Sequence, residues 1–180
     1  MKVNNFSEDI KEVKICSGVY FPDYRGVLKK SIHGDELTEL MPEVKEVLCT
    51  TSKQNVIRGL HFQKEPSEIS KFLTCVQGEI LDVFLDIRKD SKNFGKYGVK
   101  NLNENDNESI FIPKGFAHGY ITLSKVSVVV YLQSGNYNSE FDMAINPLSV
   151  GIDWKVDKPI VSEKDLNALT LEEYKKIINY

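Results

Sequence analysis

Short strand-like runs separated by turn signals fill most of this 180-residue chain, and they constrain its fold more than any other feature. The runs are rich in β-branched and aromatic residues, and the breaks carry Pro, Gly, Asn or Asp, as at Pro113-Lys114-Gly115. Many strands with few helical patterns predict an all-β fold, a sandwich or a barrel. The expected strands cover residues 12–20, 26–31, 44–50, 56–62, 71–76, 79–87, 97–101, 109–112, 118–123 and 126–133.

Helical patterns are confined to two places. Residues 34–41 are expected to form one short helix, and a second is expected from Thr170, a suitable N-cap followed by Glu and then Lys. The chain contains no internal repeat, low-complexity run or interdomain linker. We therefore expect one domain over residues 1–180.

The composition excludes several classes of protein. A net charge of −3 disfavours a nucleic-acid-binding surface, which is usually basic. No apolar run reaches the length of a membrane span, and the N-terminus lacks the apolar core of a signal peptide. The three cysteines are odd in number and widely spaced, so we expect them to be reduced and packed, in a cytoplasmic protein: Cys16, Cys49 and Cys75.

The heptapeptide at residues 56–62, Val-Ile-Arg-Gly-Leu-His-Phe, places Arg58 and His61 close together on a strand pattern. A base beside a fixed positive charge suits the removal of a proton next to a carbonyl in an anionic substrate. Taken alone, such a pair is more often a surface arginine and a structural histidine.

The chain has three histidines. His33 lies in a polar stretch and is expected at the surface, whereas His118 follows a Pro-Gly turn and enters a strand. Two histidines from two strands of one barrel could bind a metal. However, the sequence has no H-x-H pair and no nearby Glu or Gln placed as a third ligand, so no metal site is expected.

Three more residues are candidates for a catalytic role, but each also has an ordinary structural explanation. Tyr131 lies in an apolar strand, where its hydroxyl needs either a hydrogen-bond partner or a catalytic role. The sequence favours neither explanation over the other. Lys71 begins a strand and could be an ordinary edge lysine. Asp165 lies in Ser-Glu-Lys-Asp, which looks like a helix start, so it could be an N-cap.

Taken together, these motifs resemble the dTDP-4-dehydrorhamnose 3,5-epimerase family, in the family's order and over nearly the whole chain. The resemblance implies a cupin-type jelly-roll barrel, a homodimer, no metal or other cofactor, and a nucleotide-linked 4-keto sugar as substrate. It rests on R-G-L-H-F-Q (58–63), Lys71, G-E-I-L-D-V-F-L-D-I-R-K-D-S (78–91), I-P-K-G-F-A-H-G-Y (112–120), Tyr131, Tyr137, G-I-D-W (151–154) and S-E-K-D (162–165).

The resemblance also implies catalytic roles by matched position. The 4-keto group acidifies the protons on C3 and C5, and His61 would remove one of them as the base. Asp165 would orient His61 and favour its charged form. Tyr131 would be the acid on the opposite face, and Lys71 would stabilise the enolate oxygen.

The remaining matched residues would bind the substrate. Arg58 would hold the pyrophosphate, Arg25 would contact a phosphate, and His118 would line the sugar site. Tyr137 and its loop would influence whether one carbon or both are epimerised. The expected product is a deoxysugar precursor for surface polysaccharides.

Two segments near the N-terminus depart from the family pattern. The family's D-x-R-G-F-F-x-E is here Asp23–Lys30, in which Arg25 is kept but an aromatic residue is replaced by Val27. The family's Q-x-N-x-S, which helps to hold thymine, begins here with Glu46. A carboxylate only accepts hydrogen bonds, so Glu46 would suit the two adjacent donors of guanine. The sequence therefore leaves open a GDP-linked as well as a dTDP-linked sugar.

A third departure follows Tyr137. The family's Trp-Asn-Asp-Pro stretch is replaced by Met143–Pro147. The choice between epimerisation at C3, at C5 or at both therefore stays open, as does the choice between a hexose and a heptose.

Three alternatives compete with an epimerase. A sugar-nucleotide 3,4-ketoisomerase on a similar barrel is disfavoured by Lys71 and Tyr131 together with S-E-K-D. A metal-dependent cupin oxygenase lacks its ligand set. A non-catalytic sugar-nucleotide-binding cupin is expected to have lost His61, Tyr131 or Asp165, and this chain has all three.

Overall fold

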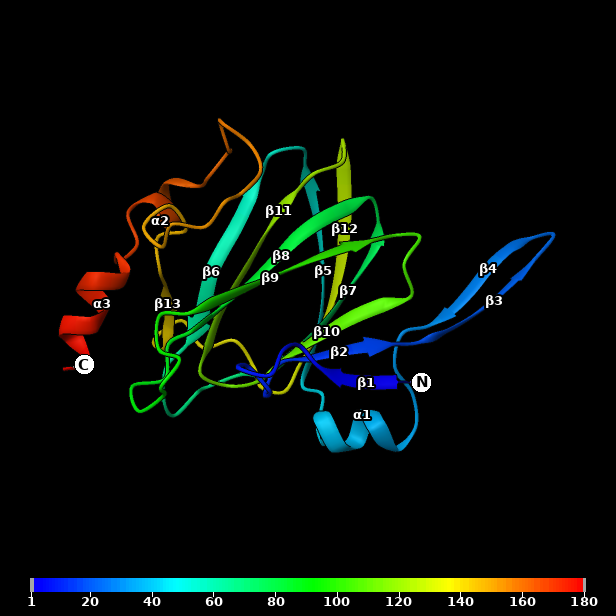
Figure 1. Ribbon diagram of the computed structural model, residues 1–180, viewed down its shortest axis with the longest axis horizontal. Helices are drawn as coiled ribbons and strands as arrows, with labels where there is room; N and C mark the ends of the chain where they lie inside the picture. The colour runs from blue at the N-terminus through cyan, green and yellow to red at the C-terminus, as the bar shows by residue number, and fades with distance from the viewer. Residues whose placement is uncertain (1, 180) are drawn as a thin grey trace.

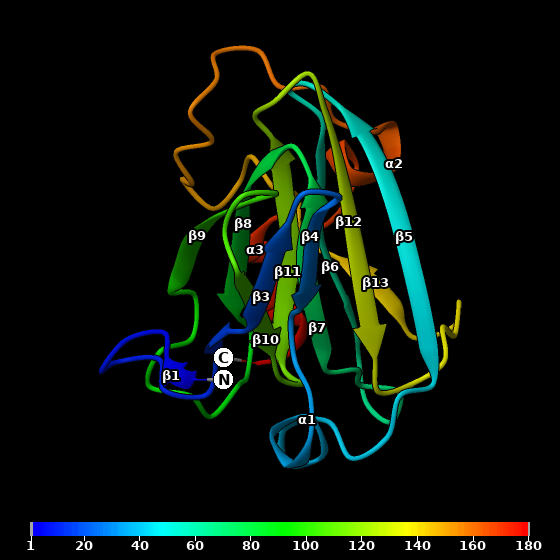
Figure 2. The same ribbon diagram turned by 90° about the vertical axis from the view of Figure 1, so that its right-hand side faces the viewer.

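Two antiparallel sheets form the body of the computed structural model, which describes residues 2–179 (Figures 1 and 2). The larger sheet has the order β1 (Lys2–Asn5), β2 (Lys14–Ser17), β10 (Glu108–Ile112), β7 (Lys71–Gln77), β12 (Val126–Gln133) and β5 (Glu46–Lys53). The smaller sheet has the order β13 (Asp142–Ala144), β6 (Ile57–Gln63), β11 (Phe116–Thr122), β8 (Glu79–Asp86) and β9 (Tyr97–Asn103). The predicted all-β class is confirmed.

A separate two-stranded hairpin, β3 (Val19–Asp23) and β4 (Gly26–Lys30), projects from the body at the right of Figure 1. The predicted strand 12–20 therefore divides into β2 and β3. The division falls at Gly18, where a Cβ atom would lie 2.1 Å from the carbonyl oxygen of Lys30. Only glycine allows the chain to pass so close to another backbone.

In the part of the chain that the structure describes, three short helices flank the sheets: α1 (Asp35–Leu40), α2 (Glu163–Leu166) and α3 (Leu171–Ile177). The helix expected after Thr170 is confirmed as α3, and Thr170 and Glu173 form a reciprocal capping box at its start. The helix expected at 34–41 is α1. The sequence analysis did not predict β1 or β13, because both are too short to give a clear alternation.

Alternation along the strands places apolar residues on both faces of each sheet. On β7, Leu73 packs into a core between the two sheets, and its neighbour Phe72 packs on the outer face beside α1. The outer face of the smaller sheet is covered by the C-terminal segment, with Trp154 and Tyr174 in the same cluster as Phe62. The smaller sheet is therefore buried on both faces, which explains why β8 is apolar on both sides.

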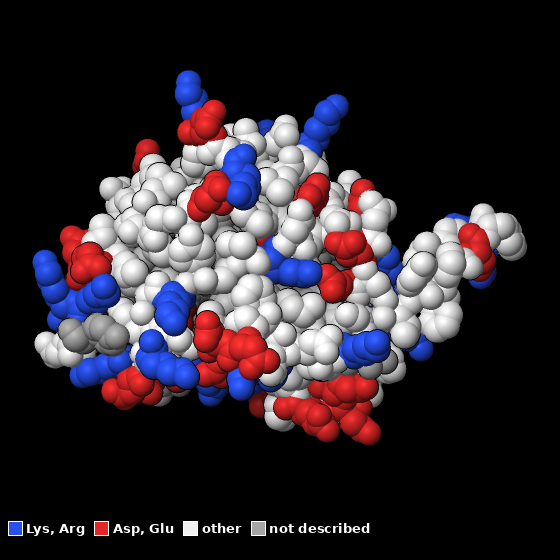
Figure 3. Space-filling view, viewed as in Figure 1, with Lys and Arg blue, Asp and Glu red and all other residues white. Residues whose placement is uncertain are grey.

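Acidic and basic side chains are interspersed on the face shown in Figure 3, and a group of acidic residues lies over α1. Within residues 2–179, no helix has the length and hydropathy needed to span a membrane.

Candidate active site

A cavity of about 290 Å³ opens between the two sheets and contains side chains from both. Six of the residues predicted from the sequence line it: Arg58, His61, Lys71, His118, Tyr131 and Tyr137. They come from separate parts of the chain, and the fold brings them together. Asp165 reaches the cavity through its contact with His61. Arg25 and Glu46 are not among the lining residues.

Arg58 and His61 both line the cavity because β6 is irregular between them. On a regular strand, residues three apart point to opposite faces. Here Arg58 pairs with Tyr120 and His61 pairs with His118, so three steps on β6 match two steps on β11. This extra residue is a β-bulge, and Gly59 occupies it with φ of 127°.

His61 and Asp165 form a hydrogen-bonded pair, with 2.6 Å between Nε2 and Oδ1. Asp165 is buried in α2, and its backbone N–H donates to the N-cap side chain of Ser162. The alternative that Asp165 is itself the N-cap is therefore wrong. Burial raises the pKa of Asp165, but hydrogen bonds from His61 and Ser162 outweigh it, and the net pKa is lowered. The carboxylate thus stays charged beside the imidazole.

Lys71 lies on β7, between β10 and β12, so the alternative of an edge lysine is wrong. Its Nζ donates to the carbonyl oxygen of His61 over 2.9 Å and so bridges the two sheets. Burial lowers the pKa of Lys71 to about 8, although Asp142 and Asp82 oppose the shift. The ammonium is therefore a cation at neutral pH, in a place where water screens it little.

His118 belongs to a second histidine–carboxylate pair, with 2.7 Å between its Nε2 and Asp82 Oδ2. Asp82 is fully buried, and its other oxygen has no hydrogen-bond partner among residues 2–179. Burial lowers the pKa of His118, and Asp82 opposes this. No role was predicted for Asp82 from the sequence, although a carboxylate within the apolar run 80–87 indicates that it needs a hydrogen-bond partner.

Tyr131 lies on β12, across the cavity from the strand that carries His61. Its ring packs edge-on against His118, with 5.9 Å between the ring centroids. Burial raises the pKa of Tyr131 well above its usual range, and the neighbouring Tyr120 and then the negative charge of Asp82 add to this effect. Tyr131 is therefore a neutral phenol at neutral pH, able to donate a proton.

Glu46 and Tyr137 meet at the rim of the cavity. The backbone N–H of Tyr137 donates to Glu46 Oε1 over 2.9 Å. Two residues that the sequence analysis did not consider, Asp142 and Lys164, also line this rim and form an ion pair of 2.7 Å. Tyr137 is more than half exposed.

Arg25 lies at the exposed tip of the β3–β4 hairpin, where its guanidinium pairs with Asp23. The hairpin surface around it carries exposed apolar side chains, including Phe21 and Leu28, which face each other across the two strands. Within the described chain, Arg25 does not join the cavity.

The cysteines partly match the prediction. Cys16 and Cys75 are buried, and burial raises the pKa of each thiol to about 11. Cys49 is exposed, so the expectation that it is packed is wrong. It lies on β5, the outermost strand of the larger sheet, where one side of the strand has no neighbour. His33 is exposed, as expected.

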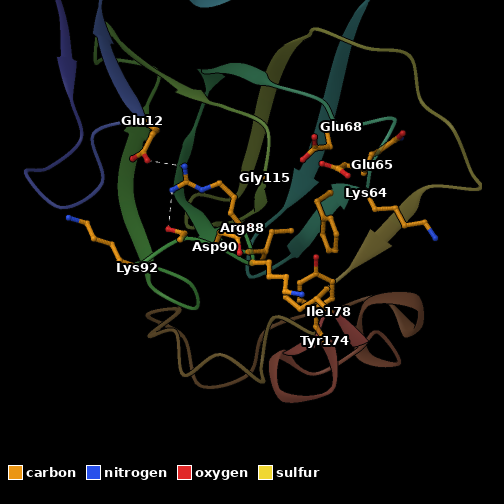
Figure 4. Close-up of a pocket in the computed structure, with 15 residues that line it drawn as sticks. Glu12, Lys64, Glu65, Glu68, Arg88, Asp90, Lys92, Gly115, Tyr174 and Ile178 are labelled. Atoms are coloured by element: carbon orange, nitrogen blue, oxygen red, sulfur yellow. Dashed lines mark hydrogen bonds and ion pairs between the residues drawn. The ribbon is translucent and has the colours of Figure 1, made fainter. Parts of the chain in front are cut away.

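A larger hollow of about 820 Å³ lies outside the sheets, between α3 and the loop that follows β8 (Figure 4). Arg88 pairs there with Glu12 (Figure 4). It also pairs with the buried Asp86. The surrounding lysines are balanced by carboxylates, and none of the predicted catalytic residues lies there. The residues predicted to be catalytic lie at the smaller cavity instead.

Comparisons with known proteins agree with this geometry. The family model for dTDP-4-dehydrorhamnose 3,5-epimerase matches residues 7–173. A dTDP-4-dehydrorhamnose 3,5-epimerase from Shigella flexneri is 35% identical over 170 residues, which are 92% of this chain and 94% of that protein.

Two solved structures have the same fold. A 4-keto-6-deoxy sugar epimerase from the novobiocin biosynthetic gene cluster of Streptomyces spheroides has a TM-score of 0.93 at 27% identity, covering 98% of this chain and 90% of that one. A 3′-monoepimerase from Streptomyces bikiniensis in complex with dTDP-quinovose has a TM-score of 0.90 at 27% identity, covering 97% of this chain and 90% of that one. The predicted cupin-type fold is confirmed. The chain belongs to the dTDP-4-dehydrorhamnose 3,5-epimerase family, and it is an isomerase.

Proposed function

We propose that this enzyme epimerises a nucleotide-linked 4-keto-6-deoxy sugar by proton transfer through an enolate. The observation that carries the proposal is the placement of His61 and Tyr131 on facing walls of one cavity. Inversion at carbon requires that a proton leave one face of the ring and another arrive on the opposite face. A base on β6 and an acid on β12 meet that requirement.

His61 is the proposed base. Its pair with Asp165 fixes the ring and stabilises the imidazolium that forms when a proton is taken from carbon. Negative charge then develops on the 4-keto oxygen. Lys71 supplies a buried ammonium for that oxygen, and its bond to the His61 carbonyl holds it close to the base.

Tyr131 is the proposed acid, which returns a proton to the opposite face. The His118 ring packs against it, and Asp82 holds His118 Nε2, so Nδ1 is the nitrogen left for a sugar oxygen. The proposed steps use only side chains of the protein.

Arg58 is the proposed phosphate contact within the chain. Arg25 is too far along the projecting hairpin to serve the same cavity, but it can serve a second copy. We therefore propose a homodimer of one-domain subunits, in which the hairpin of each subunit docks on the other. The exposed apolar surface of the hairpin supports this arrangement.

A dTDP-linked sugar is the leading candidate substrate, because the relatives are described as acting on dTDP sugars. A GDP-linked sugar is the second candidate, because Glu46 replaces the glutamine of the thymine-binding pattern. In the protein, one carboxylate oxygen of Glu46 already accepts from Tyr137. Only the remaining acceptor capacity of Glu46 is free for a base.

Turnover of matched dTDP- and GDP-linked 4-keto-6-deoxy sugars tests the proposal, with product configuration at C3 and C5 read by NMR. We expect inversion at one or both carbons, and faster turnover of the dTDP sugar. A preference for GDP would reverse the order of the two candidates. No inversion with either sugar would contradict the proposed function.

A further inference from the structure

Arg58 differs from the other two arginines of the chain in the partners that it has. Arg25 and Arg88 both form ion pairs with carboxylates, those of Asp23 and Asp86. In the part of the chain that the structure describes, Arg58 forms hydrogen bonds but no ion pair. The protein therefore leaves the positive charge of Arg58 without a neutralising carboxylate, in a side chain that lines the cavity.

Two neutral acceptors from β5 hold the guanidinium of Arg58. Its Nε donates to Ser52 Oγ over 2.7 Å, and its Nη2 donates to the carbonyl oxygen of Thr51 over 3.2 Å. A guanidinium has no acceptor, so the direction of both hydrogen bonds is fixed. Both hydrogens of Nη1 and the second hydrogen of Nη2 remain for a ligand.

Ser52 is a buried residue outside the wall of the cavity. It is 3% exposed, and it is not among the residues that line the cavity. Its hydroxyl also lies 2.8 Å from the hydroxyl of the fully buried Tyr120. Because β5 and β6 belong to different sheets, the hydrogen bond from Arg58 to Ser52 crosses from one sheet to the other. Ser52 Oγ is thus a fixed point against which the guanidinium is held.

A neutral anchor orients the guanidinium and leaves its charge available to an anion. A carboxylate in place of Ser52 would also hold Arg58, but it would cancel the charge that an anionic ligand needs. With no anchor at all, the exposed side chain of Arg58 would lose more rotamer freedom when a ligand binds. A serine hydroxyl and a backbone carbonyl avoid both losses.

We propose that Ser52 is a positioning residue, which holds Arg58 in the orientation that binds the diphosphate of the substrate. The inference rests on the proposed function, in which Arg58 is the phosphate contact. Ser52 acts through Arg58, because it lies outside the cavity itself. It orders the guanidinium before the ligand arrives, so it strengthens binding and leaves the chemical step to other residues.

Binding of dTDP to Ser52→Ala and to Ser52→Cys, measured by calorimetry, tests the proposal without turnover. A cysteine fills nearly the same space as a serine, but its sulfur is a weak acceptor, so both variants lose the anchor. We expect the Kd for dTDP to rise about 5- to 30-fold in each, within the rotamer entropy of an arginine side chain. With the 4-keto sugar, KM should rise by a similar factor, and kcat should change by less than about twofold.

Ser127→Ala is the matched control. Ser127 lies directly opposite Ser52 on β12, it is fully buried, and its hydroxyl lies 2.8 Å from Thr122 Oγ1. Like Ser52, it does not line the cavity. This variant is expected to keep the wild-type Kd. If Ser52→Ala keeps it as well, or if the two variants weaken binding equally, the positioning role is overturned.

The effect of Ser52 must also depend on Arg58. In an Arg58→Ala background, Ser52→Ala is expected to change the Kd for dTDP by less than about twofold, because the guanidinium that Ser52 positions is absent. An undiminished effect of Ser52→Ala in that background would place its role elsewhere and overturn the inference.

The Nε resonance of Arg58 separates this inference from the proposed function. In ¹⁵N-labelled protein without ligand, Arg58→Lys assigns this resonance among those of the three arginines. We expect its hydrogen exchange with solvent to be about 10-fold faster in Ser52→Ala and unchanged in Ser127→Ala. An unmoved exchange rate would overturn the inference, even in an active epimerase. Faster exchange together with weaker dTDP binding, in a protein that inverts no sugar, would support the inference and overturn the proposed function.

Discussion

At the scale of single residues, the proposed mechanism uses two buried charged groups, Asp165 and Lys71, and the pKa values of both are lowered. Asp165 stays ionised beside His61, and Lys71 is a cation whose pKa is lowered to about 8 by burial. Both charges are expensive to bury. In the proposed mechanism, Asp165 stabilises the imidazolium of His61 and Lys71 stabilises the enolate oxygen.

Lys71 sets an expected pH dependence. The side chain is charged below a pKa of about 8 and neutral above it. On the alkaline side, the kcat for epimerisation is therefore expected to fall as the pH rises through about 8. Lys71→Arg should lower kcat but remove this fall, because arginine stays charged. A pH profile of kcat that stays flat to pH 10 would contradict the assigned role.

The same residue has an expected effect on stability. Unfolding restores the pKa of Lys71 from about 8 to 10.5, so the unfolded state binds more protons between these values and stability rises with pH there. Below pH 8 Lys71 is charged in both states, and the full cost of burying its charge, on the order of 3 kcal/mol, lowers the free energy of unfolding. Lys71→Met is therefore expected to raise the free energy of unfolding at pH 7 by up to that amount while abolishing turnover. Urea titration measures this free energy of unfolding. A Lys71→Met variant less stable than the wild-type protein at pH 7 would contradict the cost assigned to burying the charge.

At the scale of elements, the β-bulge in β6 interrupts the regular alternation of side chains between the two faces of the strand. It turns Arg58 and His61 to the same side, and Gly59 allows β6 to pass close to β11. A Cβ atom on Gly59 would lie 2.5 Å from the Cα atom of Gly119.

Gly59→Ala is accordingly expected to destabilise the protein by about 3 kcal/mol or more, since a positive φ and a backbone clash act together. It should also lower turnover by moving Arg58 and His61. Gly151→Ala is the control, because Gly151 also has a positive φ of 78° but has no atom within 4 Å of a Cβ position. It should cost only about 1 kcal/mol, measured by thermal unfolding. If Gly59→Ala and Gly151→Ala lost the same amount of stability, the close approach of β6 to β11 at Gly59 would be unimportant.

The long strands were predictable from sequence because each is a run of β-branched, aromatic or other apolar residues bounded by turn residues, as on β12. The bulge was not, because Gly59 in a strand marks several kinds of irregularity equally well. The partnership of Asp82 with His118 was also out of reach, since 36 residues separate them and only the pairing of β8 with β11 brings them together. His61, Lys71 and Tyr131 were identified by their motifs, and the fold then placed them around one cavity.

At the scale of the whole molecule, the β3–β4 hairpin stands apart from both sheets and exposes apolar side chains. Phe21 and Leu28 are 55% and 60% exposed and form a cross-strand pair. Such a surface is unfavourable in water unless a partner covers it.

Sedimentation is expected to give twice the 20.5 kDa mass of the chain. The double variant Phe21→Ser/Leu28→Ser should shift the equilibrium toward monomer and weaken dTDP binding, because the hairpin carries Arg25. Arg25→Ala should weaken binding without changing the mass. A monomeric wild-type protein with full activity would contradict the dimer proposal.

The central claim, that His61 removes a proton from carbon, is tested most directly by deuterium incorporation from heavy water into a dTDP-linked 4-keto-6-deoxy sugar, followed by NMR at C3 and C5. The wild-type protein is predicted to incorporate deuterium at one or both carbons. His61→Asn is predicted to lower incorporation by about 10²- to 10⁴-fold while dTDP still binds. No incorporation by the wild-type protein, or undiminished incorporation by His61→Asn, would contradict the account.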